Sequence, residues 1–185
     1  MNRSDMFQEI DFLTGTKIIL KPLALEMAKD IFAATEESRE ELYRFMPWEN
    51  KTVDEAKEFI ELSIKQRHEG TDLNLAIYES DTGRIAGTIG IHKFDPFTPL
   101  CEVGYWVSSS MHGQGYATDA LLTLLRFCYD KLGLVRVDAR TAVENTASQR
   151  VLIKCGFREE GFKEKAELCH GVWHDLKLFG KILAY

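Results

Sequence analysis

The sequence has no long apolar run and no excess of basic residues. Its 185 residues include 23 lysines and arginines against 29 aspartates and glutamates, giving a formal net charge of -6. A nonspecific nucleic-acid binder would need a basic surface instead. The longest apolar-rich stretch, around 121–129, is interrupted by Thr123 and Arg126 and is much shorter than the roughly 18 residues of a membrane span. We therefore expect neither direct nucleic-acid binding nor a membrane-inserted protein.

The sequence also lacks a paired-cysteine pattern and a recognisable signal peptide. Its four cysteines are dispersed along the chain: Cys101, Cys128, Cys155 and Cys169. This distribution predicts reduced thiols, no disulfide and a cytoplasmic protein. The length and a hydrophobic content of 45% predict one domain, residues 1–185, with a full core.

A metal site is not expected either. Cys169, His170 and His174 lie close together in the sequence, but their spacing does not complete a tetrahedral site. Two histidines on a hairpin are more typical of a polar surface. We therefore predict no bound metal.

Strand-like and helix-like patterns alternate along the chain. Strands are expected at 16–21, 73–78, 84–94, 102–107, 134–141, 157–169 and 172–183, and helices at 25–45, 52–68, 116–132 and 146–155. Thr52 and Glu55 form a T-x-x-E capping box at the start of the second helical segment. This order predicts an α/β (α+β) fold with a mixed central sheet of about seven strands and helices on both faces.

The most informative segment is 102–118, which reads EVGYWVSSSMHGQGYAT and joins a predicted strand to a predicted helix. Gly113 and Gly115 lack a Cβ atom, so the backbone can turn sharply there and approach a ligand. The first turn of the following helix leaves amides without helical partners, and these amides favour an anion. The segment therefore predicts a pyrophosphate site on the amides of residues 113–118.

This turn resembles motif A of the GNAT acetyltransferases, Q/R-x-x-G-x-G/A, with Ser110 standing where the family has Gln or Arg. Thr118 occupies the place of the third glycine in a dinucleotide fingerprint, and no Gly-Lys-Ser/Thr follows, which disfavours nicotinamide and nucleoside triphosphate cofactors. The resemblance implies acetyl-CoA as cosubstrate. The residues implied to bind it here are Trp106, Val107, Ser108, Gly113, Gln114, Gly115, Tyr116, Ala117 and Thr118.

A second segment resembles the N-x-x-(A/S)…G-F pattern that ends the core of these enzymes. It runs from Asn145 through Ser148 to Gly156 and Phe157. Asn145 is predicted to be the N-cap of a short helix, and Gly156 its C-terminal glycine. In the family, the Asn position also presents its amide to the pantetheine arm. The resemblance therefore adds Asn145 to the acetyl-CoA site without excluding its capping role.

Within the family, the chain most resembles the Rim-type N-acetyltransferases, which modify the amino termini of ribosomal proteins. The resemblance covers about 17–182 and includes the segment ELCHGVWHD at 167–175. Leu152 stands where many GNAT enzymes have a tyrosine that protonates the leaving thiolate, and the Rim-type branch also lacks it. The resemblance implies that Ser148 contacts acetyl-CoA and steadies the thiolate, while Glu167 acts as general base.

These implied roles suit amine acetylation. An α-amino group has a pKa near 8, so roughly a tenth is already the reactive free base at pH 7, and one modest carboxylate suffices. The family stabilises the oxyanion with a backbone amide near Val107. Glu102 on the motif strand is an alternative base. Ordinary structural roles also stay open, with Glu167 as a solvated carboxylate and Ser148 as a polar residue of the first helical turn.

Four aromatic residues in the amino-terminal helical region are predicted to be core packing, namely Tyr43, Phe45, Trp48 and Phe59. In the GNAT fold this region often walls the acceptor site. Their alternative role is therefore an acceptor pocket.

Three function classes remain, because fold does not fix the acceptor. The first is acetylation of protein amino termini that begin with Ser or Ala, with ribosomal proteins as implied acceptors. The second is acetylation of a small amine, such as a polyamine, an amino acid or an antibiotic. The third is a noncatalytic acyl-CoA-binding module, against which Ser148 and Glu167 argue. The acidic balance favours a basic acceptor, and both a monomer and a homodimer stay open.

Overall fold

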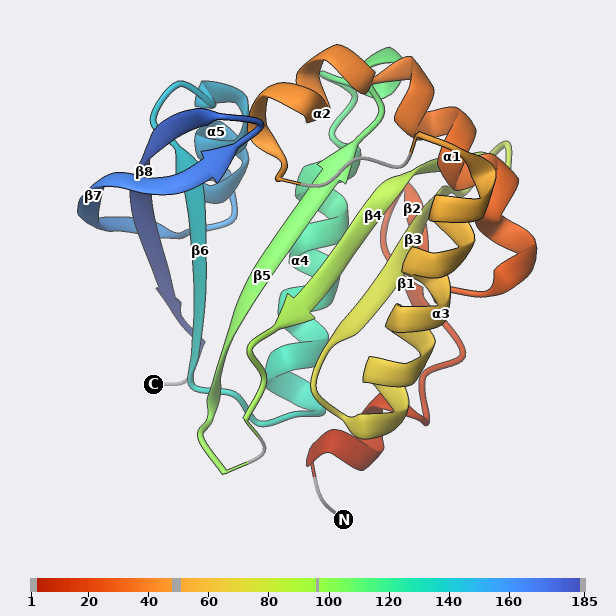
Figure 1. The fold of residues 1–185 in the computed structure, drawn as a ribbon. Helices are drawn as coiled ribbons and strands as arrows, with labels where there is room; N and C mark the ends of the chain where they lie inside the picture. Colours follow the sequence, from red (N-terminus) through yellow and green to blue (C-terminus); the bar gives the residue numbers. More distant parts are fainter. Residues whose placement is uncertain (1–2, 48–50, 96, 184–185) are drawn as a thin grey trace.

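The computed structural model describes residues 3–47, 51–95 and 97–183. These residues form one eight-stranded sheet in the order β1-β2-β3-β4-β5-β6-β8-β7 (Figure 1). The strands are β1 (Leu13–Thr14), β2 (Ile18–Pro22), β3 (Leu73–Glu79), β4 (Ile85–His92), β5 (Leu100–Val107), β6 (Arg136–Ala142), β7 (Arg158–Cys169) and β8 (Val172–Ile182). Among these strands, β5 and β6 pair in parallel and the other neighbours pair antiparallel. The predicted mixed sheet is confirmed, with the two-residue β1 as an addition to the expected seven strands.

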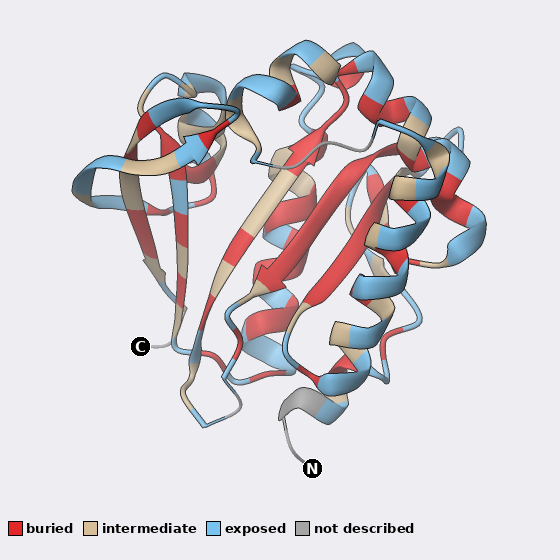
Figure 2. Cartoon of the chain, in the orientation of Figure 1, coloured by how far each residue is buried: buried red, intermediate tan, exposed pale blue. Residues whose placement is uncertain are grey.

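Helices cover both faces of this sheet, as predicted (Figure 1). The α-helices are α1 (Ala28–Glu37), α2 (Arg39–Phe45), α3 (Val53–Glu69), α4 (Tyr116–Asp130) and α5 (Thr146–Lys154), and the 3-10 turns are Arg3–Phe7, Leu25–Met27 and Ser109–Met111. One core joins α4 and α5 to the sheet, and a second joins α1 and α3 to the opposite face. Strands β3 and β4 are buried almost throughout (Figure 2), because helices cover them on both sides.

Local signals in the sequence explain where two of the helices begin. The Thr52 hydroxyl accepts a hydrogen bond from the Glu55 amide at 3.1 Å, and the Glu55 carboxylate accepts one from the Lys51 amide at 2.5 Å. The Asn145 side chain caps α5 in the same way, by accepting from the Ser148 amide at 3.0 Å. The predicted capping roles of Thr52 and Asn145 are therefore present.

The parallel pair β5–β6 opens into a cleft. Its ladder contains only three pairs, Leu100–Arg136, Cys101–Val137 and Glu102–Asp138. Beyond them β5 continues along β4 as far as Val107, while β6 continues along β8 as far as Ala142, and the two strands separate toward the top of Figure 1. Backbone groups of β5 and β6 have no partner in the ladder between these strands there, although side chains already contact two of the carbonyls, those of Val107 (His112) and Ala142 (Gln149). Groups without such a partner can pair with a ligand.

The two faces of β5 meet different helices. Cys101 and Val103 belong to the core beneath α4 and α5, and Tyr105 packs against it. Trp106 points to the other face and packs against Ala34 of α1 and Leu42 of α2. Because side chains alternate along a strand, the sheet separates an α4–α5 side of the cleft from an α1–α3 side.

Candidate active site at the opening between two strands

A cavity of about 640 Å³ lies at the opening between β5 and β6. It reaches the turn before α4, the first part of α5, and the side chains of β4, β5 and β6. Of the residues expected from the sequence, those that line it are Glu102, Trp106, Val107, Gly113, Gly115, Tyr116, Ala117, Thr118, Asn145, Ser148 and Glu167. The two sequence motifs and both candidate bases therefore meet in one cavity.

The glycine turn has the backbone conformation that the motif predicts. Gly113 has φ +75° and Gly115 has φ +90°, values that residues with a Cβ rarely adopt. A Cβ on Gly113 would meet no atom within 4 Å, and one on Gly115 would meet only the Lys17 Nζ at 4.0 Å. The turn therefore borders open space, and helix α4 begins directly after it at Tyr116, as an anion site requires.

Neighbouring side chains fix this turn in place. The Lys17 ammonium donates to the Gln114 carbonyl at 3.0 Å, and the Asp119 carboxylate accepts from the Lys17 amide at 2.6 Å and from the Thr16 amide at 3.1 Å. The Lys17 ammonium also adds positive charge beside the turn. These contacts hold the chain before β2 against the N-terminus of α4, where a pyrophosphate would bind.

Ser108 and Gln114, two of the expected acetyl-CoA residues, are not among the residues that line the cavity. The Ser108 hydroxyl donates to the Glu37 carboxylate at 2.8 Å, as does the Ser110 hydroxyl. Arg84 pairs with the same carboxylate at 2.6 Å. The hydrogen bond from Ser108 is the main cause that lowers the pKa of Glu37. Ser110, the departure from motif A, therefore joins the motif loop to α1.

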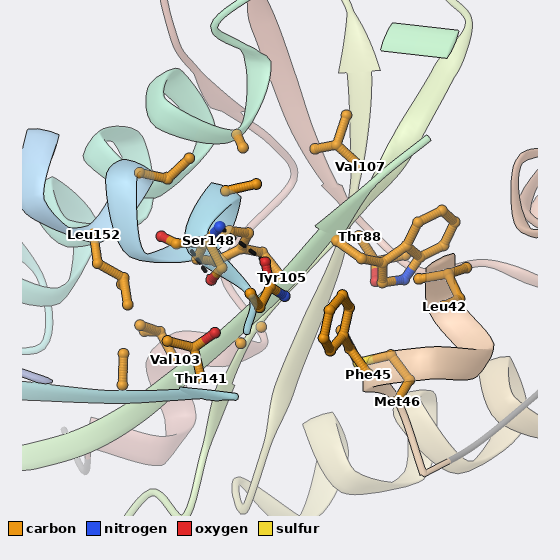
Figure 3. Close-up of a pocket in the computed structure, with 18 of the residues that line it drawn as sticks. Leu42, Phe45, Met46, Thr88, Val103, Tyr105, Val107, Thr141, Ser148 and Leu152 are labelled. Atoms are coloured by element: carbon orange, nitrogen blue, oxygen red, sulfur yellow. Dashed lines mark hydrogen bonds between the residues drawn. The ribbon is translucent and has the colours of Figure 1, made fainter. Parts of the chain in front are cut away.

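Ser148 lies on α5 and contacts a residue that the sequence analysis missed. The Tyr105 hydroxyl lies 3.2 Å from the Ser148 Oγ and 3.2 Å from the Ser148 carbonyl oxygen (Figure 3). Burial raises the pKa of the Tyr105 phenol well above its usual range, so the phenol keeps its proton. The sequence contains Tyr105 within a strand pattern, but only the pairing of the strands shows that it points toward α5.

The two candidate bases share one cation. Glu102 pairs with the Lys93 ammonium at 2.6 Å and with the Arg140 Nε at 3.1 Å, whereas Glu167 lies 3.8 Å from the Arg140 guanidinium. The exposed fractions of the two carboxylate side chains are nearly equal, at 20% and 21%. Glu102 is thus the more fully paired of the two, and Glu167 keeps more of its hydrogen-bonding capacity for a ligand.

Apolar side chains of α2 and α3 form part of the α1–α3 side of the cavity, beside polar residues of the sheet such as His92, Glu102 and Arg140. Phe45 and Phe59 line it together with Leu42 and Met46, so these two aromatics combine packing with a position at the cavity. Tyr43 is 48% exposed and stacks on His170, with ring centroids 4.0 Å apart, so the prediction of core packing was wrong for this residue. Trp48, the fourth aromatic of the prediction, lies outside the described residues.

A histidine–carboxylate pair at the same cavity was also missed. The His92 Nδ1 lies 3.1 Å from the Asp72 Oδ1, and this hydrogen bond is the main cause that lowers the pKa of Asp72. His92 lines the cavity at the end of β4, opposite Glu102. No motif in the sequence connects Asp72 and His92, which are 20 residues apart.

The three residues considered for a metal each have a different environment. Cys169 is buried, the His170 Nε2 lies 3.1 Å from the Met46 carbonyl, and His174 lies 3.6 Å from Glu144. His174 is only 7% exposed, so the expectation that both histidines are surface residues was wrong for it. Across residues 3–47, 51–95 and 97–183, no group of three or more His, Cys, Asp or Glu could hold a metal ion.

Within the part of the chain that the structure describes, no helix combines the length and apolar character needed to cross a membrane.

Comparisons with known proteins identify relatives of this chain. The family described as acetyltransferase (GNAT) domain matches residues 17–158. The uncharacterized N-acetyltransferase YoaA of Bacillus subtilis (strain 168) is 27% identical over 168 residues, which cover 90% of this chain and 94% of YoaA. The ribosomal-protein-serine acetyltransferase of Escherichia coli (strain K12) is 24% identical over 133 residues, covering 72% and 73% of the two chains.

A solved structure has the same fold. The microcin C7 self immunity acetyltransferase MccE, in complex with acetyl-CoA and AMP, matches with a TM-score of 0.84 at 26% identity. The match covers 90% of this chain and 93% of the MccE chain.

Proposed function

Because the chain belongs to the GNAT acetyltransferase family, in the Rim-type branch, and is an acetyl-CoA-dependent N-acetyltransferase, we propose that it acetylates protein amino termini. The proposed acceptors begin with Ser or Ala and carry basic residues downstream. The observation that carries this proposal is the meeting of the glycine turn, Ser148 and Glu167 in one cavity.

The residues present fit acetyl-CoA. The left-handed glycines at the start of α4 offer first-turn amides to a pyrophosphate, and the separated strands offer unpaired backbone groups to an amide-containing arm. We propose that Trp106, Val107, residues 113–118 and Asn145 hold it, although the Ser108 and Gln114 side chains do not line the cavity. When bound, acetyl-CoA supplies a thioester whose carbonyl carbon an amine can attack.

We assign the base to Glu167. As the amine attacks, Glu167 takes its proton, and the electron pair of the breaking carbon–sulfur bond stays on sulfur. Glu102 is less suited to this role, because Lys93 and Arg140 already engage its carboxylate at 2.6 and 3.1 Å. Ser148 steadies the thiolate, which is a fair leaving group since the reference thiol pKa is near 8.5.

A basic acceptor is supported by the charge beside the cavity. A neighbouring groove of about 500 Å³ is lined by Glu37, Glu40, Glu41 and Glu144, with Arg44 as the basic lining residue. The residues that it shares with the main cavity are Ser38, Glu41, Phe45, Asn145 and Ala147. A peptide whose amino terminus enters the cavity could thus lay downstream Lys or Arg residues against carboxylates, an attraction that salt should screen.

A small-molecule amine is the second candidate acceptor. It is favoured by the likeness to MccE, which is described as a microcin C7 self immunity acetyltransferase. A noncatalytic acyl-CoA-binding module is the third reading, and the position of both Ser148 and Glu167 at the cavity argues against it.

Thiol release from acetyl-CoA, measured with matched acceptors, tests the proposal. We expect a Ser-initiated peptide with downstream lysines to turn over faster than the same peptide blocked at its amino terminus and faster than spermidine. Its KM should rise with salt. Faster turnover of spermidine or of the blocked peptide would leave an acetyltransferase but remove the N-terminal assignment, and no thiol release with any amine would favour the noncatalytic module.

A further inference from the structure

The hydroxyl of Thr141 is a buried polar group that the mechanism above leaves unused. Thr141 is 5% exposed, and within the described part of the chain its Oγ1 has no hydrogen-bond partner. The residue lines the cavity between β5 and β6. Buried hydroxyls are nearly always paired, and an unpaired one destabilises the folded protein. A hydroxyl left unpaired at a cavity is therefore in place to pair with a ligand.

Strand register places Thr141 across the opening from Tyr105. Glu102 of β5 pairs with Asp138 of β6, and three residues farther along each strand are Tyr105 and Thr141. Both side chains point to the face covered by α4 and α5, because alternation places them with the core pair Cys101 and Val137. Figure 3 shows Tyr105, Thr141 and Ser148 in the same part of the cavity.

We propose that Tyr105, Thr141 and Ser148 form one hydroxyl site for the thioester end of acetyl-CoA. Thr141 donates a hydrogen bond directly to this end of the bound molecule. Tyr105 is a positioning residue, which acts by holding the Ser148 hydroxyl. This inference rests on the proposed acetyltransferase function and gives a role to two residues, Tyr105 and Thr141, that the sequence analysis did not name as site residues.

The contact between Tyr105 and Ser148 explains the positioning role. The phenol oxygen lies 3.2 Å from both the Oγ and the carbonyl oxygen of Ser148. Because the phenol stays protonated, it can donate its one hydrogen to the Ser148 Oγ, and this arrangement leaves the Ser148 hydroxyl hydrogen free to point at the sulfur. The hydroxyls transfer no proton: the amine proton goes to Glu167, and the sulfur leaves with its electron pair.

Replacing Thr141 with Val tests the direct contact. Thr141→Val keeps the shape and removes an unpaired hydroxyl, so the free protein should keep or raise its Tm. Its affinity for acetyl-CoA, measured by calorimetry, should fall about 5- to 10-fold, as expected for one lost hydrogen bond. Thr141→Ser, which retains the hydroxyl, should bind within about twofold of wild type.

Thr35→Val is the matched control. Thr35 is also buried, but its hydroxyl donates to the Ile31 carbonyl at 2.9 Å in α1, away from the cavity lining. This variant should lower Tm and leave acetyl-CoA affinity unchanged. The proposal for Thr141 is overturned if Thr141→Val binds acetyl-CoA like wild type, or if it loses Tm as Thr35→Val does. Failure of the wild type to bind acetyl-CoA would instead refute the proposed function.

A double-mutant cycle tests Tyr105. Tyr105→Phe should lower kcat about 10-fold, the size of one hydrogen bond, with the acceptor KM unchanged. In a Ser148→Ala background the same change should cost nothing further, since residues in one network are not additive. Full additivity, or an effect confined to Tm or to acceptor KM, would show a packing role and overturn the assignment.

Discussion

At the scale of single residues, the proposed chemistry depends on how one arginine is shared. Arg140 lies 3.1 Å from Glu102 and 3.8 Å from Glu167, so each carboxylate affects the other through the same guanidinium. Glu102 has a second cation, Lys93, at 2.6 Å. This asymmetry is the physical reason for assigning the base to Glu167, and it allows the two carboxylates to be separated by mutation.

Glu167→Gln should lower kcat by about 100-fold, because it keeps the shape of the side chain but removes the proton acceptor. The loss should shrink as pH rises from about 6 to 9, since more of an α-amino group with a pKa near 8 is then already neutral. Steady-state rates across this pH range measure it. Glu102→Gln is the matched control with a smaller expected loss, and a reversed order of the two losses would move the base to Glu102.

At the scale of the elements, the candidate site lies where β5 and β6 separate. The three-pair ladder ends at Glu102 and Asp138, and the turn before α4 and the cap of α5 both lie at the resulting cavity. The turn before α4 contains glycines with a left-handed backbone. A substitution by alanine changes the backbone preference of this turn and adds only one methyl group to the cleft.

Gly115→Ala should weaken acetyl-CoA binding by about 10-fold or more, because a Cβ disfavours the left-handed backbone that aims the amides, at a cost of about 1–2 kcal/mol. Calorimetric titration with acetyl-CoA measures the change. Gly83→Ala is a matched control: Gly83 has φ +70° and open space around its Cβ but lies in the β3–β4 turn. Equal affinities in the two folded variants would contradict a ligand role for the turn at Gly115.

The sequence predicted most elements because their signals are local. The capping residues Thr52 and Asn145 and the turn glycines mark helix boundaries through contacts within a few residues. The two-residue β1 was missed because it is too short to show a period. Tyr105 and Thr141 could not be proposed as site residues from the sequence, because their position at one cavity depends on the register of β5 and β6 and on where these strands separate.

The sequence also left the role of Glu102 open, because this role depends on strand pairing too. Which face of a strand points to a cleft is set by distant pairing partners, here β4 and β6. The ion pair between Glu102 and Arg140 joins two strands that are separated by α4 in the chain. A local sequence pattern therefore cannot predict this ion pair.

At the scale of the whole molecule, paired carboxylates link stability to pH. Hydrogen bonds from Ser108, His92, Thr82 and Arg136 are the main causes that lower the pKa values of Glu37, Asp72, Glu79 and Glu160, respectively. A group with a lowered folded-state pKa stabilises the protein above its unfolded-state pKa. That stabilisation is lost as pH falls through the folded-state value.

The melting temperature should therefore fall as pH drops below about 4.5, the usual value for Glu. Calorimetric scans between about pH 3 and pH 7 check the direction. The melting temperature of Glu37→Gln should fall less steeply in the acid range. The substitution removes a carboxylate whose pKa is lowered in the folded protein by hydrogen bonds from Ser108 and Ser110. A melting temperature that rises on acidification would contradict the assignment of these contacts.

A one-tube competition tests whether the cleft brings a protein amino terminus to acetyl-CoA. The enzyme, acetyl-CoA, spermidine and a peptide with a free amino-terminal Ser and internal lysines are incubated together, and mass spectrometry locates the acetyl group. We expect acetylation of the peptide α-amino group ahead of its lysines and ahead of spermidine. Acetyl groups found first on spermidine or on the lysine side chains would contradict it.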